Sequence, residues 1–543
     1  MRATAAHAVW AAALVPEAVA FDAATRDVAA AQTRLLRALV ARNATSAFGR
    51  DHDLARVRAL DDLRHALPLA DFDAHRSYVE RIANGENDVL GRSPVRVLEP
   101  TSGSSAASKL IPVSDDLRRA FARGVAPWIV DLLGRDPRIA TGPAYWSLSP
   151  ALRPDARSAA GLPIGFDDDA AYLGAASHLL ERAVLAVPKA VRRLADVEVF
   201  RYVTLLHLVG RAPLRLVSVW NPSFLTLLLD ALPRHADALA DDLAAGRCRP
   251  PDGVERPELA LPPARTRAAA LQRATSGATE EVARRLWPQL RLLSCWTDAH
   301  AATAATELAR RVPHAHMQGK GLIATEAFVS LPLHAAAAPV LAVRCHVFEF
   351  LEPGGTTTRF AHELEVGDEV EVVVTSDVLY RYRLGDRVRV EGHYRRAPTL
   401  RFLGRAAPTS DRVGEKLHER HVREALSAAC AASGAAPRFA LVACDDGATP
   451  AAYRVYVEGC EAHHEAVLIA ALDAELRANP YYAYARDLGQ LGPLAAVHVR
   501  DGAAAFETAM VGRGQRRGDV KPVALSPYGD WGALFHASAP NAP

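Results

Sequence analysis

The chain has 543 residues, of which half are hydrophobic and 23% are charged, and its formal net charge is +2 at pH 7. This composition is typical of a soluble globular protein with two or three domains. A net charge so close to zero argues against nucleic acid or an anionic membrane as the main partner. The six cysteines are scattered and include no CxxC pair, so neither a zinc cluster nor a disulfide framework is indicated.

The N-terminal stretch over residues 5–15 is only weakly similar to the core of a signal peptide. It is rich in alanine rather than leucine, Glu17 interrupts it, and a helical pattern continues beyond it. No apolar run in the sequence is expected to reach the length of a membrane span. We therefore expect a cytoplasmic monomer that works on small molecules, with neither a membrane nor nucleic acid as partner.

Helices dominate the first part of the expected fold, where the first ~90 residues have apolar side chains at helical spacing. Ser114 is expected to cap a further helix over residues 114–133, because its hydroxyl precedes two acidic residues. Further helices are expected over 173–187 and 303–312, and strands over 199–208, 214–219 and 290–296.

A serine-rich loop, Thr101-Ser-Gly-Ser-Ser-Ala-Ala-Ser-Lys109, follows a predicted strand over residues 95–98. Gly103 permits a turn that points consecutive backbone N–H groups at one place, and the hydroxyls of Thr101, Ser102, Ser104 and Ser105 add donors. Lys109 adds a positive charge. The loop suits a polyphosphate, although it lacks the GxxxxGK[ST] spacing, and a plain surface turn is the alternative.

Lysine is rare in this chain, since only five of the 64 basic residues are lysine: Lys109, Lys189, Lys320, Lys416 and Lys521. Where any cation serves, this sequence uses arginine, so a retained lysine marks a position that needs a slim, compact ammonium group. Four of the five lie in loops that contain glycine or several serines, whereas Lys189 is expected to be an ordinary surface residue.

A second glycine-containing segment runs from Met317 to Leu331 and includes Thr325 and Glu326. Its apolar flanks predict a strand that stops at this pair, and strand ends in α/β sheets are where ligands bind. A carboxylate between apolar neighbours needs a partner, and Mg²⁺ is a natural one.

From Val340 onward the pattern predicts a β-rich meander with separate strands over 380–383 and 387–391, joined by a turn at Gly385-Asp386. Asp386 by itself is then a simple turn former. Residues 406–414 form a polar hinge, and the remainder predicts a small α+β domain with its own core. We expect a large domain over 1–404 and a small one over 405–543.

Three motifs in this order resemble those of the Gretchen Hagen family of acyl-acid amido synthetases, a branch of the adenylate-forming superfamily. They are Thr101–Lys109, Gln318-Gly-Lys-Gly-Leu-Ile-Ala-Thr-Glu326 and Tyr380-Arg-Tyr-Arg-Leu-Gly-Asp386. Phe402-Leu-Gly-Arg405 and Gly414-Glu-Lys416 support the match. The resemblance implies an α/β adenylate-forming fold: a large N-terminal domain of β-sheets flanked by helices, a β-rich subdomain, and a small mobile C-terminal α+β domain.

The resemblance also implies the chemistry: a carboxylate attacks Mg-ATP to give acyl-AMP and pyrophosphate, and an amine, usually of an amino acid, then displaces AMP. Two alternatives stay open. Transfer to the thiol of CoA or a carrier protein shares the first step, although no basic tract suits the CoA 3′-phosphate. The other is a nucleotide-binding protein that has lost catalysis.

Roles for single residues follow from the same resemblance. Thr101, Ser102, Gly103, Ser104, Ser105 and Lys109 are expected to hold the β and γ phosphates of ATP. Thr325 would touch the α-phosphate, Glu326 would bind Mg²⁺, and Asp386 would accept hydrogen bonds from both ribose hydroxyls. Arg405 would reach the ribose or phosphates. Lys521 would stabilise the transferring α-phosphate, with a tail lysine as its alternative.

Overall fold

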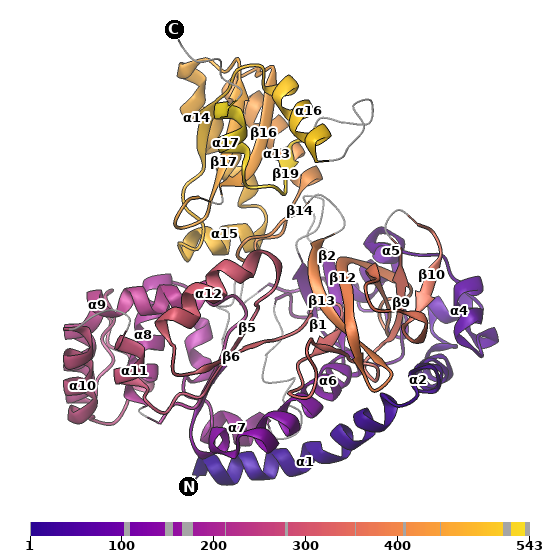
Figure 1. The fold of residues 1–543 in the computed structure, drawn as a ribbon, viewed down its shortest axis with the longest axis horizontal. Helices are drawn as coiled ribbons and strands as arrows, with labels where there is room; N and C mark the ends of the chain where they lie inside the picture. Colours follow the sequence, from indigo (N-terminus) through magenta and orange to yellow (C-terminus); the bar gives the residue numbers. More distant parts are fainter. Residues whose placement is uncertain are drawn as a thin grey trace. The chain divides into compact units, whose positions relative to one another are not determined.

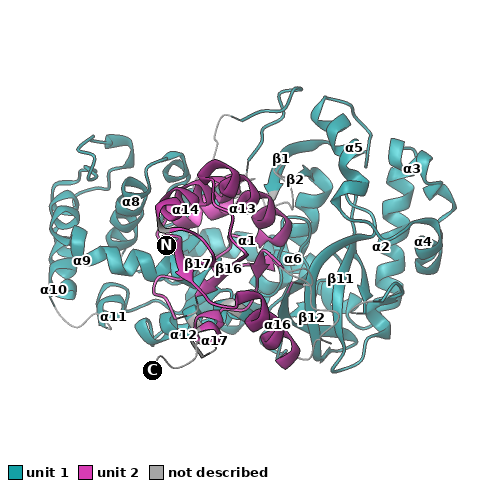
Figure 2. Cartoon of the chain, turned by 90° about the horizontal axis from the view of Figure 1, so that it is seen from above, with its two compact units in different colours: residues 1–100, 110–404 teal, residues 101–109, 405–543 magenta. Residues whose placement is uncertain are grey.

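The computed structural model describes residues 2–101, 109–146, 156–165, 177–211, 213–276, 281–352, 355–405, 409–445, 447–513 and 523–537. Ser102, Gly103, Ser104, Ser105 and Lys521 lie outside these ranges. The chain divides into two compact units, coloured separately in Figure 2: residues 1–100 with 110–404, and residues 101–109 with 405–543.

The first unit contains the helices α1 Arg2–Ala24, α2 Val28–Asn43, α3 Ala47–Asp51, α4 Leu60–Ala66, α5 Phe72–Ala83, α6 Asp115–Arg135, α7 Ser177–Ala183, α8 Val197–Gly210, α9 Pro222–Ala245, α10 Arg265–Thr275, α11 Val282–Leu286 and α12 Ala302–Arg311. The second contains α13 Glu419–Ser433, α14 Ala462–Leu476, α15 Pro480–Asp487, α16 Gly502–Gly512 and α17 Trp531–Ala537 (Figure 1).

The strands before residue 405 are β1 Val95–Thr101, β2 Lys109–Ser114, β3 Ala144–Trp146, β4 Leu216–Ser218, β5 Leu292–Cys295, β6 His316–Gly319, β7 Ser330–Leu331, β8 Val340–Leu341, β9 Val347–Leu351, β10 Thr358–Phe360, β11 Glu369–Thr375, β12 Tyr382–Tyr394 and β13 Ala397–Arg405. The later strands are β14 Thr409–Ser410, β15 Leu417–His418, β16 Phe439–Asp445, β17 Ala452–Glu458, β18 Ala495–His498 and β19 Leu525–Ser526.

A parallel four-stranded sheet in the order β3-β4-β5-β6 organises one half of the first unit. Helices connect its strands, and Figure 1 shows α8, α9 and α10 packed together beside it. β4 and β5 are buried throughout, as expected for strands covered on both faces. The carboxyl ends of all four strands therefore share one edge.

A seven-stranded sheet in the order β10-β9-β11-β12-β13-β8-β7 organises the other half. Its pairs β10–β9, β9–β11 and β11–β12 are antiparallel, with Glu371 opposite both Leu351 and Arg387. α2, α4 and α5 lie along this sheet in Figure 1, and Leu36 of α2 is fully buried. This sheet is the predicted β-rich meander.

The second unit has a four-stranded mixed sheet in the order β18-β17-β16-β19. β16 and β17 pair antiparallel, while β18 and β19 join them in parallel. α13 and α14 pack against each other, and their apolar residues share a core that includes Leu468 and Val455. The predicted α+β character of this region is confirmed.

Residues 199–208 form a helix, so the prediction of a strand there was wrong. α8 begins after Asp196, whose carboxylate accepts a hydrogen bond from Val199 N at 2.9 Å, and all residues from Val199 to Val209 are buried. A segment that is apolar on every side has no period that separates helix from strand. Its length of 14 residues favours a helix.

α1 corrects the expectation that no apolar stretch reaches the length of a membrane span. Among the described residues it is the one helix long and apolar enough to cross a membrane by length and composition. Such a helix near the N-terminus is a weak indication, because core helices pass the same test. Trp10 and Phe21 are buried in the core of the first unit, and Glu17 pairs with Arg344.

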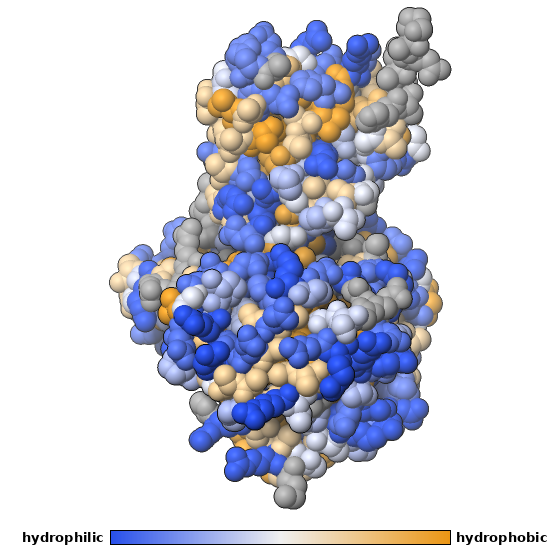
Figure 3. All heavy atoms as spheres, turned by 90° about the vertical axis from the view of Figure 1, so that its left-hand side faces the viewer, coloured by the Kyte–Doolittle hydropathy of each residue, from blue (hydrophilic) through white to orange (hydrophobic). Residues whose placement is uncertain are grey.

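The surface drawn in Figure 3 has no single broad apolar face on the larger unit, where hydrophilic residues predominate and apolar residues form small groups. Val9 and Val19 of α1 are among the exposed large apolar side chains, at 57% and 64% exposure.

Candidate active site

The segment Tyr380–Asp386 is fixed to the N-terminal helices at its first residue. Tyr380 N donates to His75 Nε2 at 3.0 Å, and the Tyr380 hydroxyl donates to Leu90 O at 2.9 Å. The phenol ring stacks on Phe48 at 4.2 Å between centroids. Burial lowers the pKa of His75, so its ring stays neutral and Nε2 can accept this hydrogen bond.

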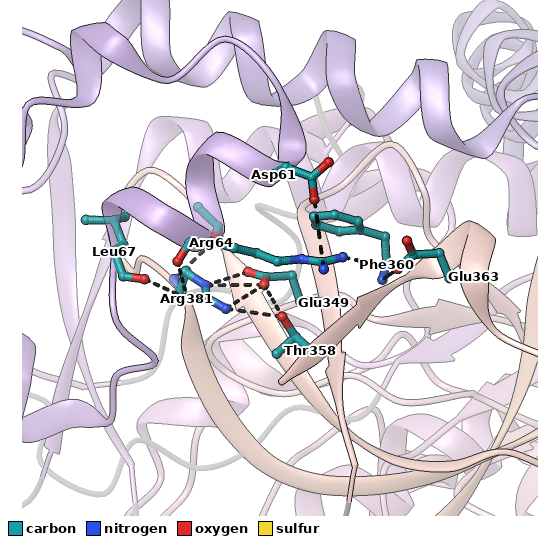
Figure 4. A network of polar contacts seen from close by, with 9 residues as sticks. Asp61, Arg64, Leu67, Glu349, Thr358, Phe360, Glu363 and Arg381 are labelled. Carbon is teal, nitrogen blue, oxygen red and sulfur yellow. Dashed lines mark hydrogen bonds and ion pairs between the residues drawn. The ribbon is translucent and has the colours of Figure 1, made fainter. Parts of the chain in front are cut away.

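Arg381 anchors the same segment through a buried network, drawn in Figure 4. Its guanidinium faces Glu349 on β9, with Nε 2.9 Å from Oε2 and the second terminal nitrogen 2.7 Å from Oε1. The side chains of this pair are 6% and 1% exposed. Two parallel charge-assisted hydrogen bonds in a buried setting fix direction as well as distance.

The remaining guanidinium N–H groups of Arg381 also have partners. They donate to Leu67 O at 2.6 Å, to Arg64 O at 3.2 Å and to the Thr358 hydroxyl at 3.1 Å. Thr358 in turn donates to Glu349 Oε1 at 2.6 Å. The network thus joins β9, β10 and the end of α4 around one side chain (Figure 4).

The backbone of Arg381 is left-handed, with φ of +44°. An arginine rarely adopts this conformation, and it costs of order 1 kcal/mol or more. Arg381 N donates to the Thr375 hydroxyl at 2.9 Å, and Arg381 O accepts from Ala70 N at 3.0 Å. These contacts and the guanidinium network hold the unusual conformation in place.

Asp386 lies in a bulge within one continuous strand, so the predicted turn between two strands was wrong. On β11, Glu371 lies opposite Arg387 and Val373 opposite Arg383, so three residues of β12 face one of β11. Gly385, with φ of +73°, allows this irregularity. The bulge adds two residues to β12, and Tyr382 and Asp386, on either side of Gly385, are both buried.

Thr325 and Glu326 form the tip of a tight hairpin, so the expectation that a strand runs up to them was also wrong. β6 ends at Gly319, and Gly321, with φ of +81°, turns the chain away. Ala324 and Ala327 exchange two backbone hydrogen bonds at 2.9 and 3.2 Å around the pair. The hydroxyl and the carboxylate are therefore displayed by a two-residue turn rather than by a strand end.

His346 forms a hydrogen bond with Phe328, next to this hairpin. Phe328 N donates to His346 Nε2 at 3.2 Å, and Gln32 donates to His346 O at 2.9 Å. Burial lowers the pKa of His346 to about 3, so the ring is neutral at physiological pH. A neutral ring can accept the N–H of Phe328, whereas a protonated one cannot.

The hairpin and the β12 segment meet through Tyr382. Its hydroxyl lies 3.5 Å from Glu326 Oε1, and Glu326 is buried at 8% exposure. Asp386 is buried four residues further along β12. Sequence reasoning gave no role to Tyr382, His75 or Glu349, and the doubled tyrosine in Tyr380-Arg-Tyr was the available signal.

The other predicted residues are distributed over both units. Lys109 begins β2 and is half-buried, and Thr101 ends β1. Arg405 ends β13 and is half-buried. Five predicted site residues lie outside the described ranges, so their roles stay predictions: Ser102, Gly103, Ser104, Ser105 and Lys521.

The segment after the hinge forms a buried polar cluster in the second unit. Glu415 accepts from Arg412 N and Val413 N at 2.9 and 2.8 Å and from the Tyr453 hydroxyl at 2.5 Å. Burial, together with the nearby Asp411, raises the pKa of Glu415 to about 7. Lys416 follows with φ of +44°, so its backbone turns sharply.

The described part of the chain contains no group of three or more His, Cys, Asp or Glu side chains arranged to hold a metal. Glu326 and the Thr325 hydroxyl are oxygen donors at one turn. A Mg²⁺ ion that travels with a nucleotide takes one or two protein carboxylates and completes its shell with phosphate oxygens and water. This donor set fits such an ion and does not fit a closed structural metal site.

Three family models match the chain in order. The GH3 family N-terminal domain matches residues 18–316, the GH3 family central domain matches 340–405, and the GH3 family C-terminal domain matches 420–528. Two similar plant proteins are the indole-3-acetic acid-amido synthetase GH3.8 of Oryza sativa subsp. indica and GH3.15 of Arabidopsis thaliana. They are 26% and 25% identical to this chain, respectively. The matches cover 76% and 70% of this chain and 72% and 68% of the relatives' own lengths.

Solved structures show the same fold. The GH3.15 acyl acid amido synthetase in complex with 2,4-DB superposes with a TM-score of 0.66 at 21% identity, covering 97% of this chain and 96% of that one. A 2-hydroxyisobutyryl-CoA ligase superposes with a TM-score of 0.50 at 12% identity, covering 86% of each chain. The predicted mixed α/β adenylate-forming fold is thereby confirmed.

Proposed function

Because the chain belongs to the GH3 family, we propose that it activates a carboxylic acid with ATP and passes the acyl group to an amine, forming an amide. Relatives in this family are amido synthetases, which are ligases. The observation that carries the proposal is the contact between the Tyr382 hydroxyl and Glu326 Oε1 at 3.5 Å, which joins the Thr325-Glu326 hairpin to β12, the strand that also carries Asp386. Family membership supports the use of ATP.

The first half-reaction would join one carboxylate oxygen of the acid to the α-phosphorus of ATP while the bond to pyrophosphate breaks. We assign Mg²⁺ binding to Glu326 and contact with the α-phosphate to Thr325. Asp386 would accept both ribose hydroxyls with its two carboxylate oxygens. Stabilising the charge on the phosphate is the main requirement of this step, since no covalent bond to the protein is needed.

In the second half-reaction the amine nitrogen would attack the acyl carbon, AMP would leave, and the amine would lose a proton.

The remaining assignments concern the phosphates and the ribose. During the first step the β and γ phosphates would be held by Lys109, by Thr101 and by the loop residues Ser102, Gly103, Ser104 and Ser105. Arg405 and Lys521 belong to the second unit or its boundary, and we assign them to the ribose or phosphates and to the α-phosphate, respectively.

The acceptor is an amino acid or another amine in this proposal, and the thiol of CoA is its competitor. The names of plant relatives mention indole-3-acetic acid, and one structure holds 2,4-DB, so these acids belong in the first panel. The test measures pyrophosphate release from Mg-ATP with each acid, alone and with pooled amino acids or with CoA. Amide product with amino acids supports the proposal, and thioester product with CoA alone overturns the acceptor.

Two variants separate the assigned roles. Glu326→Gln should abolish Mg-dependent pyrophosphate release while leaving the fold intact, because the amide keeps the shape but lacks the charge. Asp386→Asn should mainly weaken ATP binding. Glu369→Gln is the matched control. Glu369 is an exposed carboxylate on β11 that pairs with Arg387 on β12, the strand that also carries Asp386. Equal activity of Glu326→Gln and wild type would remove Glu326 from the site.

A further inference from the structure

Lys320 is a buried lysine at the carboxyl edge of the parallel sheet. It directly follows β6, and its Nζ donates to the hydroxyl of Ser218, the last residue of β4, at 2.5 Å. The side chain belongs to a residue that is 7% exposed. The carboxyl edge of parallel strands is the usual place for ligands in α/β folds.

Three indole rings surround the ammonium group, and we call Trp128, Trp146 and Trp220 the tryptophan box. Their centroids lie 5.5, 6.0 and 5.1 Å from Lys320 Nζ. The rings come from α6, from the end of β3 and from the segment before α9. Ring faces at these distances attract a cation.

The tryptophan box is itself fixed by its neighbours. Trp128 Nε1 donates to Gln318 Oε1 at 2.8 Å, and Trp128 meets Trp146 edge-on at 5.6 Å between centroids. Trp220 lies against Trp296 at 5.9 Å. Trp146, Trp220 and Trp296 are each half-buried, so the box keeps a side that solvent can reach.

The type of cation is informative here. The chain uses arginine almost everywhere, yet it places one of its five lysines between three large rings. An ammonium is a compact point charge, whereas a planar guanidinium would stack on the rings. In surroundings of low polarity, the attraction between an ammonium and an incoming carboxylate is much stronger than in water.

We propose that Lys320 and Ser218 bind the carboxylate of the acyl acid and that the tryptophan box receives its apolar part. This inference rests on the proposed function. Lys320 precedes Thr325 by five residues, so the bound carboxylate would lie beside the hairpin assigned to the α-phosphate. The box would favour flat or apolar acids over strongly hydrated ones, because indole faces offer few hydrogen bonds.

The test measures binding of indole-3-acetate, benzoate and hexanoate to the full chain by calorimetry without ATP. Lys320→Met should weaken the tightest of the three about 10- to 100-fold, which is the loss of one charge-assisted contact. Ser218→Ala should weaken it about fivefold. Lys189→Met is the matched control and should change nothing, because Lys189 pairs with Glu181 away from the strand ends. Mg-ATP affinity should stay the same in all variants.

Comparing the affinity for each acid with that for its primary amide separates carboxylate binding by Lys320 from a purely structural role of this residue. Wild type should bind each carboxylate at least tenfold more tightly than its amide, and Lys320→Met should lose this preference. Wild type binding acid and amide equally, or binding none of the three acids, would overturn the inference without any variant.

Pyrophosphate release separates this inference from the proposed function. Acid-dependent release that survives Lys320→Met with unchanged KM for the acid overturns the role of Lys320 alone. Acid binding that depends on Lys320, with no pyrophosphate released from ATP for any acid, overturns the proposed function and leaves the binding site standing.

Discussion

Arg381 and Lys320 are two buried cations of the first unit with contrasting surroundings. Arg381 faces the carboxylate of Glu349 on β9, the hydroxyl of Thr358 on β10 and two backbone carbonyls at the end of α4. Lys320 lies among three indole rings and donates a hydrogen bond to the Ser218 hydroxyl. A buried charge matched by a fixed anion holds a segment in place, whereas one beside aromatic walls suits an anionic ligand.

From this contrast we expect the largest loss of stability when Glu349, the counter-charge of Arg381, is replaced. Glu349→Gln should lower the free energy of unfolding by about 3–5 kcal/mol, because it leaves the Arg381 charge buried without its counter-charge. Chemical denaturation followed by fluorescence measures this loss. Glu369→Gln, on an exposed pair, should cost less than about 1 kcal/mol. Equal losses in the two variants would contradict the distinction.

Replacing both partners sharpens the same point. Arg381→Met combined with Glu349→Leu should recover most of the lost stability, since no unmatched charge remains. ATP affinity should still fall in the double variant, because the segment that carries Asp386 has lost its anchor. A double variant with wild-type ATP affinity would show that the network stabilises the unit without positioning the nucleotide segment.

The next largest effect concerns His346, a buried histidine whose neutral form makes the stability of the first unit depend on pH. His346 has a pKa of about 3 when folded and an ordinary value of 6.5, so the unfolded chain binds the extra proton between these limits. Stability of the first unit should therefore fall as pH drops from 6 to 4, by about 1 kcal/mol per pH unit from this group. Hydrogen exchange resolved by unit measures it, and His346→Gln should flatten the slope.

The second unit should show the opposite sign. Glu415 has a raised pKa of about 7 against an ordinary 4.5, so the folded state binds the extra proton and this contribution is lost as pH rises from 4.5 to 7. The same hydrogen-exchange experiment reports it. If both units lost stability as pH fell, the Glu415 assignment would be contradicted; if both lost stability as pH rose, the His346 assignment would be.

Lys320 should give the smallest effect on stability. Lys320→Met should change the free energy of unfolding by less than about 1 kcal/mol, because methionine fills similar space between the rings and packs well against aromatic groups. Thermal unfolding of the variant beside Glu349→Gln measures the difference. A loss as large as that of Glu349→Gln would make Lys320 a structural residue and erase the contrast.

The sequence by itself determined much of this protein. The order of the three motifs identified the family, and apolar patterns placed α6 and β5 and predicted a β-rich meander followed by a small α+β domain. Ser114 was expected as a helix cap, and its hydroxyl accepts from Leu117 N at 3.0 Å. These features depend on residues close together in the chain, where backbone geometry and capping act locally.

Only the tertiary structure decided how the site is assembled. Burial on all sides made residues 197–210 a helix, and pairing with β11 turned the expected turn at Asp386 into a bulge. Arg381 and Glu349 meet across 32 residues, and the tryptophan box brings together rings from three separate elements. No local pattern encodes such contacts, because the free energy of a buried charge depends on which distant groups the fold places around it.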